Sequence, residues 1–581
     1  MDLREVFSMK KIISLNGTWK FTPIHDQKPN NNLNRAEGQP LYAHPRLHRT
    51  GWESVSVPGV WQKYAEKYSI YEGVCWFFRE FAVGDFPENS LAKLVFKGVN
   101  YKATVYVNGK FVGTHESAYT EFAFDISQYL HSGTNAIAVE VDNRPIIVKW
   151  PNDWGYGVYG GIHRDVFVEV YSGEYVSDVE LTPSYDPETG CGLLKLTAKG
   201  NTNWLEICVD NKAYPLSGKD GAFDALLEIP GVIPWSPENP KLYPITVTAN
   251  GEVYADCTVG FRSLGRKDRK ILLNGTPVEI KGACYLCDSP KTGLAMPREE
   301  LEADLLLMKQ ANVNAVRTHY PMGDAFYELC DKMGLMVWIE PNIYCSKPAN
   351  NKTNTIFQQQ PFIDVAVSMT EEMIHGARRF ASVVFYGIGN ECNTDHPEAI
   401  PFFETISNTV RQADSTRLVG YASLYGQVGK IAHTVDVMGI NSYYGWYGTI
   451  DSRFNIYDER NGEMRIADIS ELFPTIDKVL AETPGDMPVL FTEFGGDSIP
   501  GFLCTECALW SENYHAQVVE KYIGAMRKHS QVAGGFVFAF ADYLDPSKPM
   551  NGRWNGFNLK GMVDYDRKYK LPYYALQKMY K

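Results

Sequence analysis

The sequence predicts a multidomain protein in which two all-β segments are followed by a (β/α)8 barrel. A chain of 581 residues is too long for one hydrophobic core. Up to about residue 264 the pattern is one of short alternating strands separated by turn residues. After Gly265, apolar strands alternate with amphipathic helices, which is typical of a parallel α/β architecture. We therefore expect domains at residues 1–175, 176–264 and 265–581.

The first two segments contain strand patterns without helical periodicity. Residues 1–175 include VYVNGKFVGTH, in which Asn108 and Gly109 separate two alternating runs and predict a tight hairpin. Residues 176–264 contain a second set of alternating runs. This set is short enough for a single immunoglobulin-like sandwich.

The third segment contains eight strand candidates, the number that a (β/α)8 barrel needs. Helical patterns such as PREELEADLLLMKQA and PEAIPFFETISNTVRQAD lie between several of them. No GxGxxG or Walker pattern follows a strand, so nothing favours a nucleotide-binding open sheet. The strand candidates are VEIKGACY, NAVRTHY, LMVWIEP, SVVFYGIGNE, RLVGYAS, DVMGINSYY, PVLFTEFG and GGFVFAFADY.

Composition excludes several classes of partner. The net charge of −13 argues against nucleic acid, because phosphate binding relies on clustered Lys and Arg. No run of about 18 apolar residues predicts a membrane span, and the first residues do not resemble a signal peptide. Eleven cysteines without an export signal favour reduced thiols in the cytoplasm. The pairs Cys284/Cys287 and Cys504/Cys507 lie too far apart for a zinc ribbon, so we expect no metal.

The predicted barrel strands end in polar residues, and the carboxyl ends of barrel strands line the active site. Three of these residues are carboxylates, Glu340, Glu391 and Glu493. A protonated carboxyl beside an ionised one is the pair that cleavage of a glycosidic bond needs. The strand ends therefore predict glycosidase chemistry.

The motifs carry a resemblance to glycoside hydrolase family two over essentially the whole chain. The β-rich segments match it at LNGTWKF, VPGVW, GVCWFFREF, VYVNGKFVGTH, YGGIHRDV and WSPENPKLY, and the barrel at VRTHYP, YGIGNE and LFTEFG. The resemblance implies a sugar-binding jelly roll as the first domain. It also implies a retaining mechanism with Glu391 as general acid/base and Glu493 as nucleophile.

Further roles follow from the same resemblance. Glu391 must keep a proton near neutral pH, whereas Glu493 needs hydrogen bonds that keep it ionised. Asn390 is placed to bind the sugar 2-hydroxyl. Tyr443 is similar to the family tyrosine that donates a hydrogen bond to the nucleophile.

Within the family the likeness is to the β-glucuronidases, through NSYYGWYG, ALWSENY, AFADY and NLKG. The resemblance implies that Asn558 and Lys560 bind the C6 carboxylate of a uronic acid. Asn-x-Lys occurs elsewhere in the chain, so only its position after strand eight is informative. We expect a neutral sugar to leave the buried ammonium unpaired, which would select acidic sugars. Asp153, His319, Asn441 and Tyr447 are implied as further sugar contacts.

Three departures from the family pattern leave the sugar epimer open. The end of strand one reads Tyr285-Leu286-Cys287-Asp288 in place of an Arg-His-Glu-like run. Phe380-Ala381-Ser382 replaces His-Pro-Ser, and Phe538-Ala539 replaces Trp-Asn, although Trp446 or Trp554 could supply the missing indole.

The expected activity is hydrolysis of β-D-glucuronides, with glucuronide conjugates or uronic-acid-terminated oligosaccharides as substrates and no cofactor. The alternatives are a β-galacturonidase, another family-two enzyme such as a β-galactosidase or β-mannosidase, and a non-catalytic carbohydrate-binding protein. The resemblance also implies a homodimer or homotetramer. Nothing in the long loops at 343–362 and 448–466 predicts the aglycone.

Overall fold

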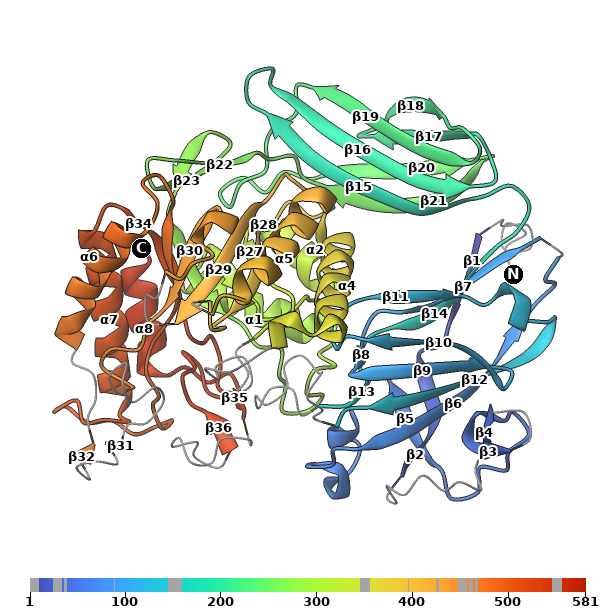
Figure 1. Cartoon of the computed structure of the whole chain (residues 1–581), viewed down its shortest axis with the longest axis horizontal. Helices are drawn as coiled ribbons and strands as arrows, with labels where there is room; N and C mark the ends of the chain where they lie inside the picture. Colours follow the sequence, from blue (N-terminus) through green and yellow to red (C-terminus); the bar gives the residue numbers. More distant parts are fainter. Residues whose placement is uncertain are drawn as a thin grey trace.

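The computed structural model describes twelve stretches of the chain. They form two β-sandwich bodies and a barrel, which follow one another in sequence order (Figure 1). This is the expected fold class. The described residues are 10–24, 34–35, 39–87, 89–144, 159–344, 356–394, 396–424, 428–447, 457–458, 463–464, 469–545 and 556–581.

The N-terminal body consists of two antiparallel sheets packed face to face. Alternate side chains such as Trp19, Phe77 and Val139 are buried between them. Asn108 and Gly109 both have positive φ and join β9 to β10, so the predicted hairpin is confirmed. One sheet has the strand order β1 (Lys10–Ser14), β14 (Val166–Tyr171), β7 (Leu91–Phe96) and β11 (Phe122–Asp125). The other has the order β10 (Lys110–Glu116), β9 (Lys102–Val107), β12 (Gly133–Asp142), β6 (Val74–Val83), β2 (Gly17–Ile24) and β5 (Glu53–Val57).

The middle body is a smaller sandwich that is anchored to the barrel by two buried polar groups. Arg262 donates hydrogen bonds to the carbonyl oxygens of Ala381 and Val383, and Trp235 Nε1 donates to Asp331 O. These contacts fix the sandwich at the amino-terminal end of the barrel strands. One of its sheets has the strand order β15 (Val176–Asp186), β16 (Cys191–Gly200) and β19 (Ala222–Pro230). The other has the order β18 (Lys212–Ser217), β17 (Trp204–Val209), β20 (Tyr243–Ala249) and β21 (Glu252–Val259).

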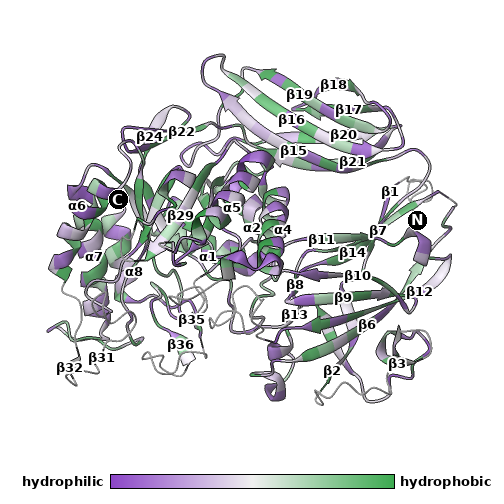
Figure 2. Ribbon diagram, viewed as in Figure 1, coloured by the Kyte–Doolittle hydropathy of each residue, from purple (hydrophilic) through white to green (hydrophobic). Residues whose placement is uncertain are grey.

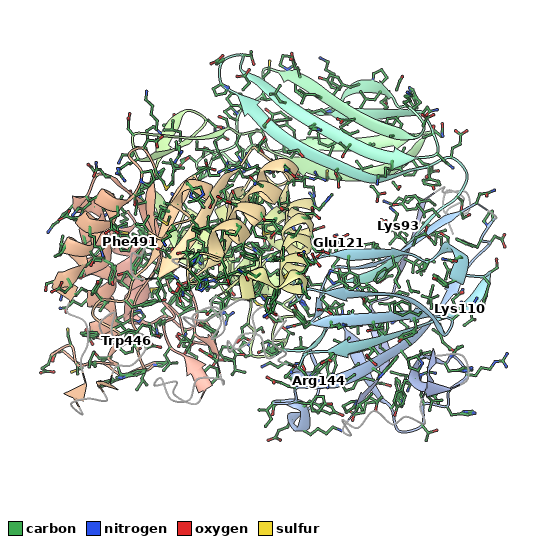
Figure 3. All side chains as sticks on the ribbon, in the orientation of Figure 1. Lys93, Lys110, Glu121, Arg144, Trp446 and Phe491 are labelled. Atoms are coloured by element: carbon green, nitrogen blue, oxygen red, sulfur yellow. The ribbon has the colours of Figure 1, made fainter. Side chains whose placement is uncertain are left out.

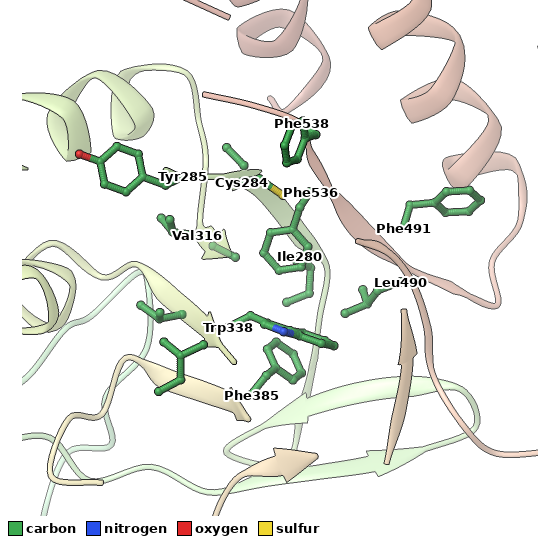
Figure 4. Close-up of a cluster of buried hydrophobic side chains, with 14 of the residues drawn as sticks. Ile280, Cys284, Tyr285, Val316, Trp338, Phe385, Leu490, Phe491, Phe536 and Phe538 are labelled. Atoms are coloured by element: carbon green, nitrogen blue, oxygen red, sulfur yellow. The ribbon is translucent and has the colours of Figure 1, made fainter. Parts of the chain in front are cut away.

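Eight parallel strands close the barrel in sequence order, as the strand pattern predicted. Large side chains including Trp338, Phe385 and Phe536 fill its interior (Figure 4). The sequence pattern extended the eighth strand to the end of GGFVFAFADY, with Asp542 near its carboxyl end, but the strand ends at Val537 and Asp542 lies beyond it. The strands are β25 (Ile280–Cys284), β26 (Ala315–Arg317), β27 (Met336–Ile339), β28 (Val383–Asn390), β29 (Leu418–Leu424), β30 (Val437–Asn441), β33 (Val489–Phe494) and β34 (Val532–Val537).

Amphipathic helices surround the barrel. In Figure 2 the outer helices α6 and α7 carry both apolar and hydrophilic residues, since each packs one face on the strands. The predicted helices at 297–311 and 397–414 are confirmed as α1 and α5. The helices are α1 (Arg298–Gln310), α2 (Asp324–Met333), α4 (Gln360–Ala377), α5 (Ala399–Ala413), α6 (Leu472–Glu482), α7 (Glu512–Lys528) and α8 (Leu571–Met579).

The N-terminal body rests on loops that follow the first two barrel strands. The rings of Tyr119 and Tyr320 stack with centroids 3.9 Å apart. Arg164 Nη2 donates to Pro321 O at 2.7 Å, and Tyr159 OH donates to Asp288 Oδ1 at 2.7 Å. These contacts bring the first domain to the carboxyl-terminal rim of the barrel.

Among the described residues, no helix combines the length and the apolar composition of a membrane span. Their cysteines, including both CxxC pairs, are unbridged, and no three of their His, Cys, Asp or Glu side chains gather as a metal site.

Candidate active site

Five barrel strands deliver buried polar side chains to one rim. Because parallel strands run in the same direction, residues at their carboxyl ends meet there. The residues are Arg317 at the end of β26, Glu340 after β27, Asn390 and Glu391 at the end of β28, Asn441 at the end of β30, and Glu493 in β33.

Glu493 receives strong donors on both carboxylate oxygens. Arg317 Nη1 donates to Oε1 at 2.9 Å, and Tyr443 OH donates to Oε2 at 2.6 Å. His319 Nε2 lies 3.5 Å from Oε1. The carboxylate of Glu493 is therefore held on both of its oxygens by hydrogen bonds.

Arg317 joins this carboxylate to the rest of the rim. Its Nη2 donates to Glu340 Oε1 at 2.9 Å and to Asn390 Oδ1 at 2.8 Å. Burial opposes its charge, but Glu340 and Glu493 outweigh burial and raise the pKa of Arg317. Burial likewise works to raise the pKa of Glu340, yet Arg317 and His319 lower it overall. Arg317 and Glu340 are therefore a fixed ion pair beneath the site.

Glu391 is held differently from Glu493. Its backbone lies in the left-handed region with φ of 53°, which is uncommon outside glycine, and its N–H donates to Ala422 O at 2.8 Å. Asn441 Nδ2 donates to Glu391 Oε1 at 2.7 Å, and Thr492 Oγ1 fixes the amide by donating to Asn441 Oδ1 at 2.7 Å. The side chain of Glu391 is therefore held by an amide that is itself fixed by a neighbouring strand.

The phenol of Tyr443 is close to both glutamates. Burial raises its pKa well above 10, and the carboxylates of Glu493 and Glu391 raise it further. The hydroxyl therefore stays protonated and acts as a donor. Asn441 also donates to Asn390 Oδ1 at 3.0 Å, so a continuous hydrogen-bond network links Glu391 to Glu493 through Asn390 and Arg317.

Lys560 lies beside this network and is 1% exposed. Its ammonium donates to Tyr447 OH at 2.8 Å and to Asp497 Oδ2. The rings of Tyr443, Trp446 and Tyr447 surround the ammonium at 5.7, 5.6 and 4.6 Å from their centroids. Figure 3 labels Trp446, which lies in the lower part of the barrel in that view. Tyr443 thus contacts both Lys560 and the carboxylate of Glu493.

One sequence-based expectation about Lys560 is wrong. We expected a neutral sugar to leave the ammonium unpaired, but Asp497 already pairs with it. A buried cation needs a counter-charge, because desolvation without one is costly. Asn558 supports the backbone: its Oδ1 accepts from Lys560 N at 3.2 Å, and its Nδ2 donates to Tyr543 OH at 2.6 Å.

Asp153 and Trp554 lie outside the described residues. The structure brings the other predicted site residues together around Glu493, Glu391 and Lys560; they are His319, Asn390, Asn441, Tyr443, Tyr447 and Asn558.

Sequence reasoning did not assign roles to Arg317, Glu340 or Asp497. Arg317 and Glu340 stand at strand ends, so their positions were a usable signal. Asp497 lies four residues after Glu493 in a loop. Nothing in its local sequence indicates that it folds back onto Lys560.

A closed (β/α)8 barrel with two differently held glutamates at its carboxyl-terminal rim defines a glycoside hydrolase. Comparison with known proteins agrees. Residues 265–581 match the family description "Glycosyl hydrolases family 2, TIM barrel domain", and residues 12–171 match "Glycosyl hydrolases family 2, sugar binding domain". The chain belongs to glycosyl hydrolases family 2.

Several relatives indicate which branch of the family it is similar to. A putative β-glucuronidase from Formosa agariphila is 26% identical over 97% of this chain and 69% of its own length. A β-galactosidase from Streptococcus thermophilus is 28% identical, but the chain spans only 43% of its length. The crystal structure of a family 2 β-galacturonidase from Eisenbergiella tayi bound to galacturonate gives a TM-score of 0.81 at 27% identity, over 98% of this chain and 97% of that one.

Proposed function

We propose that this protein is a retaining exo-β-glycosidase that hydrolyses β-D-glucuronides. The observation that supports this most directly is the buried Lys560 ammonium, which lies against Tyr443, the same residue that donates to Glu493. A cation fixed next to the reacting carboxylates favours a sugar that carries an acid group. The names of the relatives from Formosa agariphila and Eisenbergiella tayi support the same substrate class.

The proposed first step forms a covalent intermediate. Glu493 attacks the anomeric carbon, and the bond from that carbon to the leaving oxygen breaks while Glu391 gives that oxygen its proton. The first product leaves with this proton, and the sugar remains as an ester of Glu493. In the second step Glu391 takes a proton from water, and the resulting hydroxide displaces Glu493 from the anomeric carbon. Both glutamates return to their starting states.

The surrounding residues fit these roles. Arg317 and Tyr443 stabilise the Glu493 carboxylate before attack and after its release. Asn390 Oδ1 accepts from both Arg317 and Asn441, which fixes the orientation of its amide. We propose that the amide nitrogen of Asn390 binds the sugar 2-hydroxyl, a contact that strengthens as the oxocarbenium ion forms.

A β-galacturonidase is the second candidate. The relative from Eisenbergiella tayi was crystallised with galacturonate, and the barrel of this chain has Phe538-Ala539 where the glucuronidase pattern has Trp-Asn. The centroids of the Phe538 and Tyr443 rings are 6.4 Å apart, so this difference from the glucuronidase pattern is next to the site. Both candidates place a uronic acid carboxylate at Lys560.

A matched substrate panel tests the proposal. We expect turnover of an aryl β-D-glucuronide, with lower kcat/KM for the galacturonide and much lower values for the galactoside and glucoside. Retention is tested by NMR of the sugar first released, which should have the β configuration. A preference for the neutral hexosides would disprove the uronide assignment, and initial release of the α anomer would disprove the mechanism.

A further inference from the structure

The segment that carries Lys560 is fixed by charged side chains on both sides. Lys570 Nζ donates to Leu559 O at 2.9 Å, and Asp542 Oδ1 accepts from Gly561 N at 2.8 Å. Lys570 and Asp542 also pair with each other at 3.1 Å. Buried charged side chains therefore support this segment together with backbone hydrogen bonds, in which Ser498 N donates to Leu559 O and Ala539 N donates to Lys560 O.

Asp497 contributes a third contact, which differs from the others because it reaches both the backbone and the side chain. Its Oδ1 accepts from Leu559 N at 3.0 Å, and its Oδ2 accepts from the Lys560 ammonium. Asp497 follows β33, the strand that carries Glu493. One carboxylate thus ties the segment and its ammonium to the strand of the proposed nucleophile.

The contacts of the ammonium fix its direction. It has three N–H bonds, and among the described residues the structure gives it two hydrogen-bond acceptors, Tyr447 OH and Asp497 Oδ2. The aromatic rings of Tyr443, Trp446 and Tyr447 surround it at cation–π distances. One N–H therefore remains for an acceptor on the substrate.

The pair also changes how the site recognises charge. Asp497 cancels most of the field of Lys560, so an incoming carboxylate meets a local dipole rather than a full positive charge. Attraction to such a dipole falls steeply with distance and depends on its orientation. Selection of an acid group then depends on where the free N–H points.

We infer that Asp497 is a positioning residue that sets the preference for uronic acids by fixing the Lys560 ammonium toward the C6 position of the sugar. The inference rests on the proposed function, since it names the residue that makes the same site selective. Asp497 acts through Lys560 and takes no part in bond cleavage.

Asp497→Asn tests the inference, because the amide is isosteric and its oxygen can keep the bond from Leu559 N. We expect kcat/KM for the aryl uronide to fall about 100-fold, chiefly through KM, because the ammonium is no longer fixed. Hydrolysis of the matched hexoside should not fall. The uronide-to-hexoside ratio therefore separates positioning from general damage.

The pH profile gives a second measurement. A buried ammonium that has lost its counter-charge gives up its proton more readily. The alkaline decline of uronide kcat/KM should therefore begin at a lower pH in Asp497→Asn than in the wild type. His515 is neutral here, because burial and the charges of Lys570 and Lys560 lower its pKa well below 6.5. Among the described residues, the titratable or charged side chains around Lys560 are Tyr443, Tyr447, Asp497, His515, Asp542 and Lys570.

A double-mutant cycle tests the coupling directly. Lys560→Gln removes the cation that Asp497 faces and leaves the negative charge of this buried side chain without its balancing positive charge, which destabilises the fold. Lys560→Gln combined with Asp497→Asn removes both charges, so we expect it to be more stable than Lys560→Gln and to hydrolyse the hexoside faster.

Asp414→Asn is the matched control. Asp414 pairs with Arg417 in a fully buried salt bridge ahead of β29, and its loss should not change the substrate ratio.

The outcomes are distinguishable. If the wild type hydrolyses aryl uronides and Asp497→Asn keeps the same ratio and pH profile, the inference is wrong and the proposed function stands. If the wild type prefers hexosides, both are wrong. If Asp414→Asn changes the ratio as much as Asp497→Asn does, the effect is general loss of a buried charge, and the inference is again wrong.

Discussion

Two glutamates at the same rim differ in the residues that surround them. Glu493 accepts hydrogen bonds from Arg317 and Tyr443, whereas Asn441, a neutral amide, donates to Glu391. Under the proposed mechanism, the guanidinium beside Glu493 suits a carboxylate that attacks in its ionised form, and the amide beside Glu391 suits a group that gives up a proton. The proposed roles therefore rest on the neighbours of each glutamate rather than on the residue type.

The two proposed roles predict different effects of mutation. Glu493→Gln should lower kcat by at least about 10⁴-fold for every aryl uronide, because no other group forms the covalent intermediate. Glu391→Gln should lower kcat/KM, which reports the first step, strongly for poor leaving groups and much less for dinitrophenyl uronides, whose phenolate leaves without a proton. Steady-state rates across a series of phenols check this. An equal loss for all leaving groups in Glu391→Gln would contradict its assignment.

Tyr443→Phe removes the hydroxyl that donates to Glu493 at 2.6 Å and keeps the ring beside Lys560. We expect kcat to fall by about 10- to 1000-fold with little change in KM, since a donor to a charged group is lost but the sugar contacts remain. Kinetics on the aryl uronide measure both constants. Tyr386→Phe is a suitable control, because that hydroxyl bonds to Asp414 ahead of β29. A rise in KM alone would show that Tyr443 serves binding instead.

The strands of the barrel illustrate how a fold depends on residue size. Gly282 in β25 faces the ring of Phe536 in β34, and an added Cβ would lie 2.2 Å from that ring. Gly420 in β29 similarly faces Trp338 at 2.2 Å. The interior is filled because glycine on one strand accommodates an aromatic ring from another.

Gly282→Ala should therefore destabilise the protein by about 1–3 kcal/mol, because a ring in a closed barrel has little room to move. Gly524→Ala is the matched control: Gly524 lies within α7, and an added Cβ meets nothing within 4 Å. The control should be neutral or stabilising by about 0.5–1 kcal/mol, since alanine favours helix. Chemical unfolding compares them. Equal stability of the two variants would contradict the packing argument.

At the scale of the whole molecule, the N-terminal body and the barrel meet through the buried, stacked rings of Tyr119 and Tyr320 and through the half-buried Arg164. His163 lies at the same junction and donates to Ala118 O through Nε2 at 2.7 Å. Burial lowers the pKa of His163 to about 3, and the charge of Arg164 adds to this effect. The folded protein thus keeps this imidazole neutral where an unfolded chain would protonate it.

The buried, neutral His163 makes the free energy of unfolding depend on pH. Below pH about 6.5 the unfolded state binds a proton at His163 that the folded state does not, so stability is complete above that pH and is lost as pH falls. The loss amounts to about 1.4 kcal/mol per pH unit until pH about 3. His163→Asn should lower the free energy of unfolding at neutral pH. Below pH about 6.5 it should also remove the loss of about 1.4 kcal/mol per pH unit that His163 causes. Urea unfolding from pH 7 to pH 4 measures it, with the exposed His48→Asn as control. An unchanged slope in His163→Asn would show that another group controls acid unfolding.

The sequence predicted much of the architecture because its signals are local. Periodicity separated strands from helices, Asn108-Gly109 predicted a hairpin, and the polar strand ends predicted where Glu340, Glu391 and Glu493 would meet. Where a residue stands at the carboxyl end of a barrel strand, its position already implies its neighbours.

The tertiary structure decided what lies between elements that are distant in the chain. Asp497 follows strand seven and Lys560 follows strand eight, and only the closed barrel pairs them. The different donors to Glu391 and Glu493 also come from other strands, through Asn441 and Arg317. Sequence pattern specifies backbone conformation and the burial of each element, whereas charge pairing depends on contacts that form only when the barrel closes.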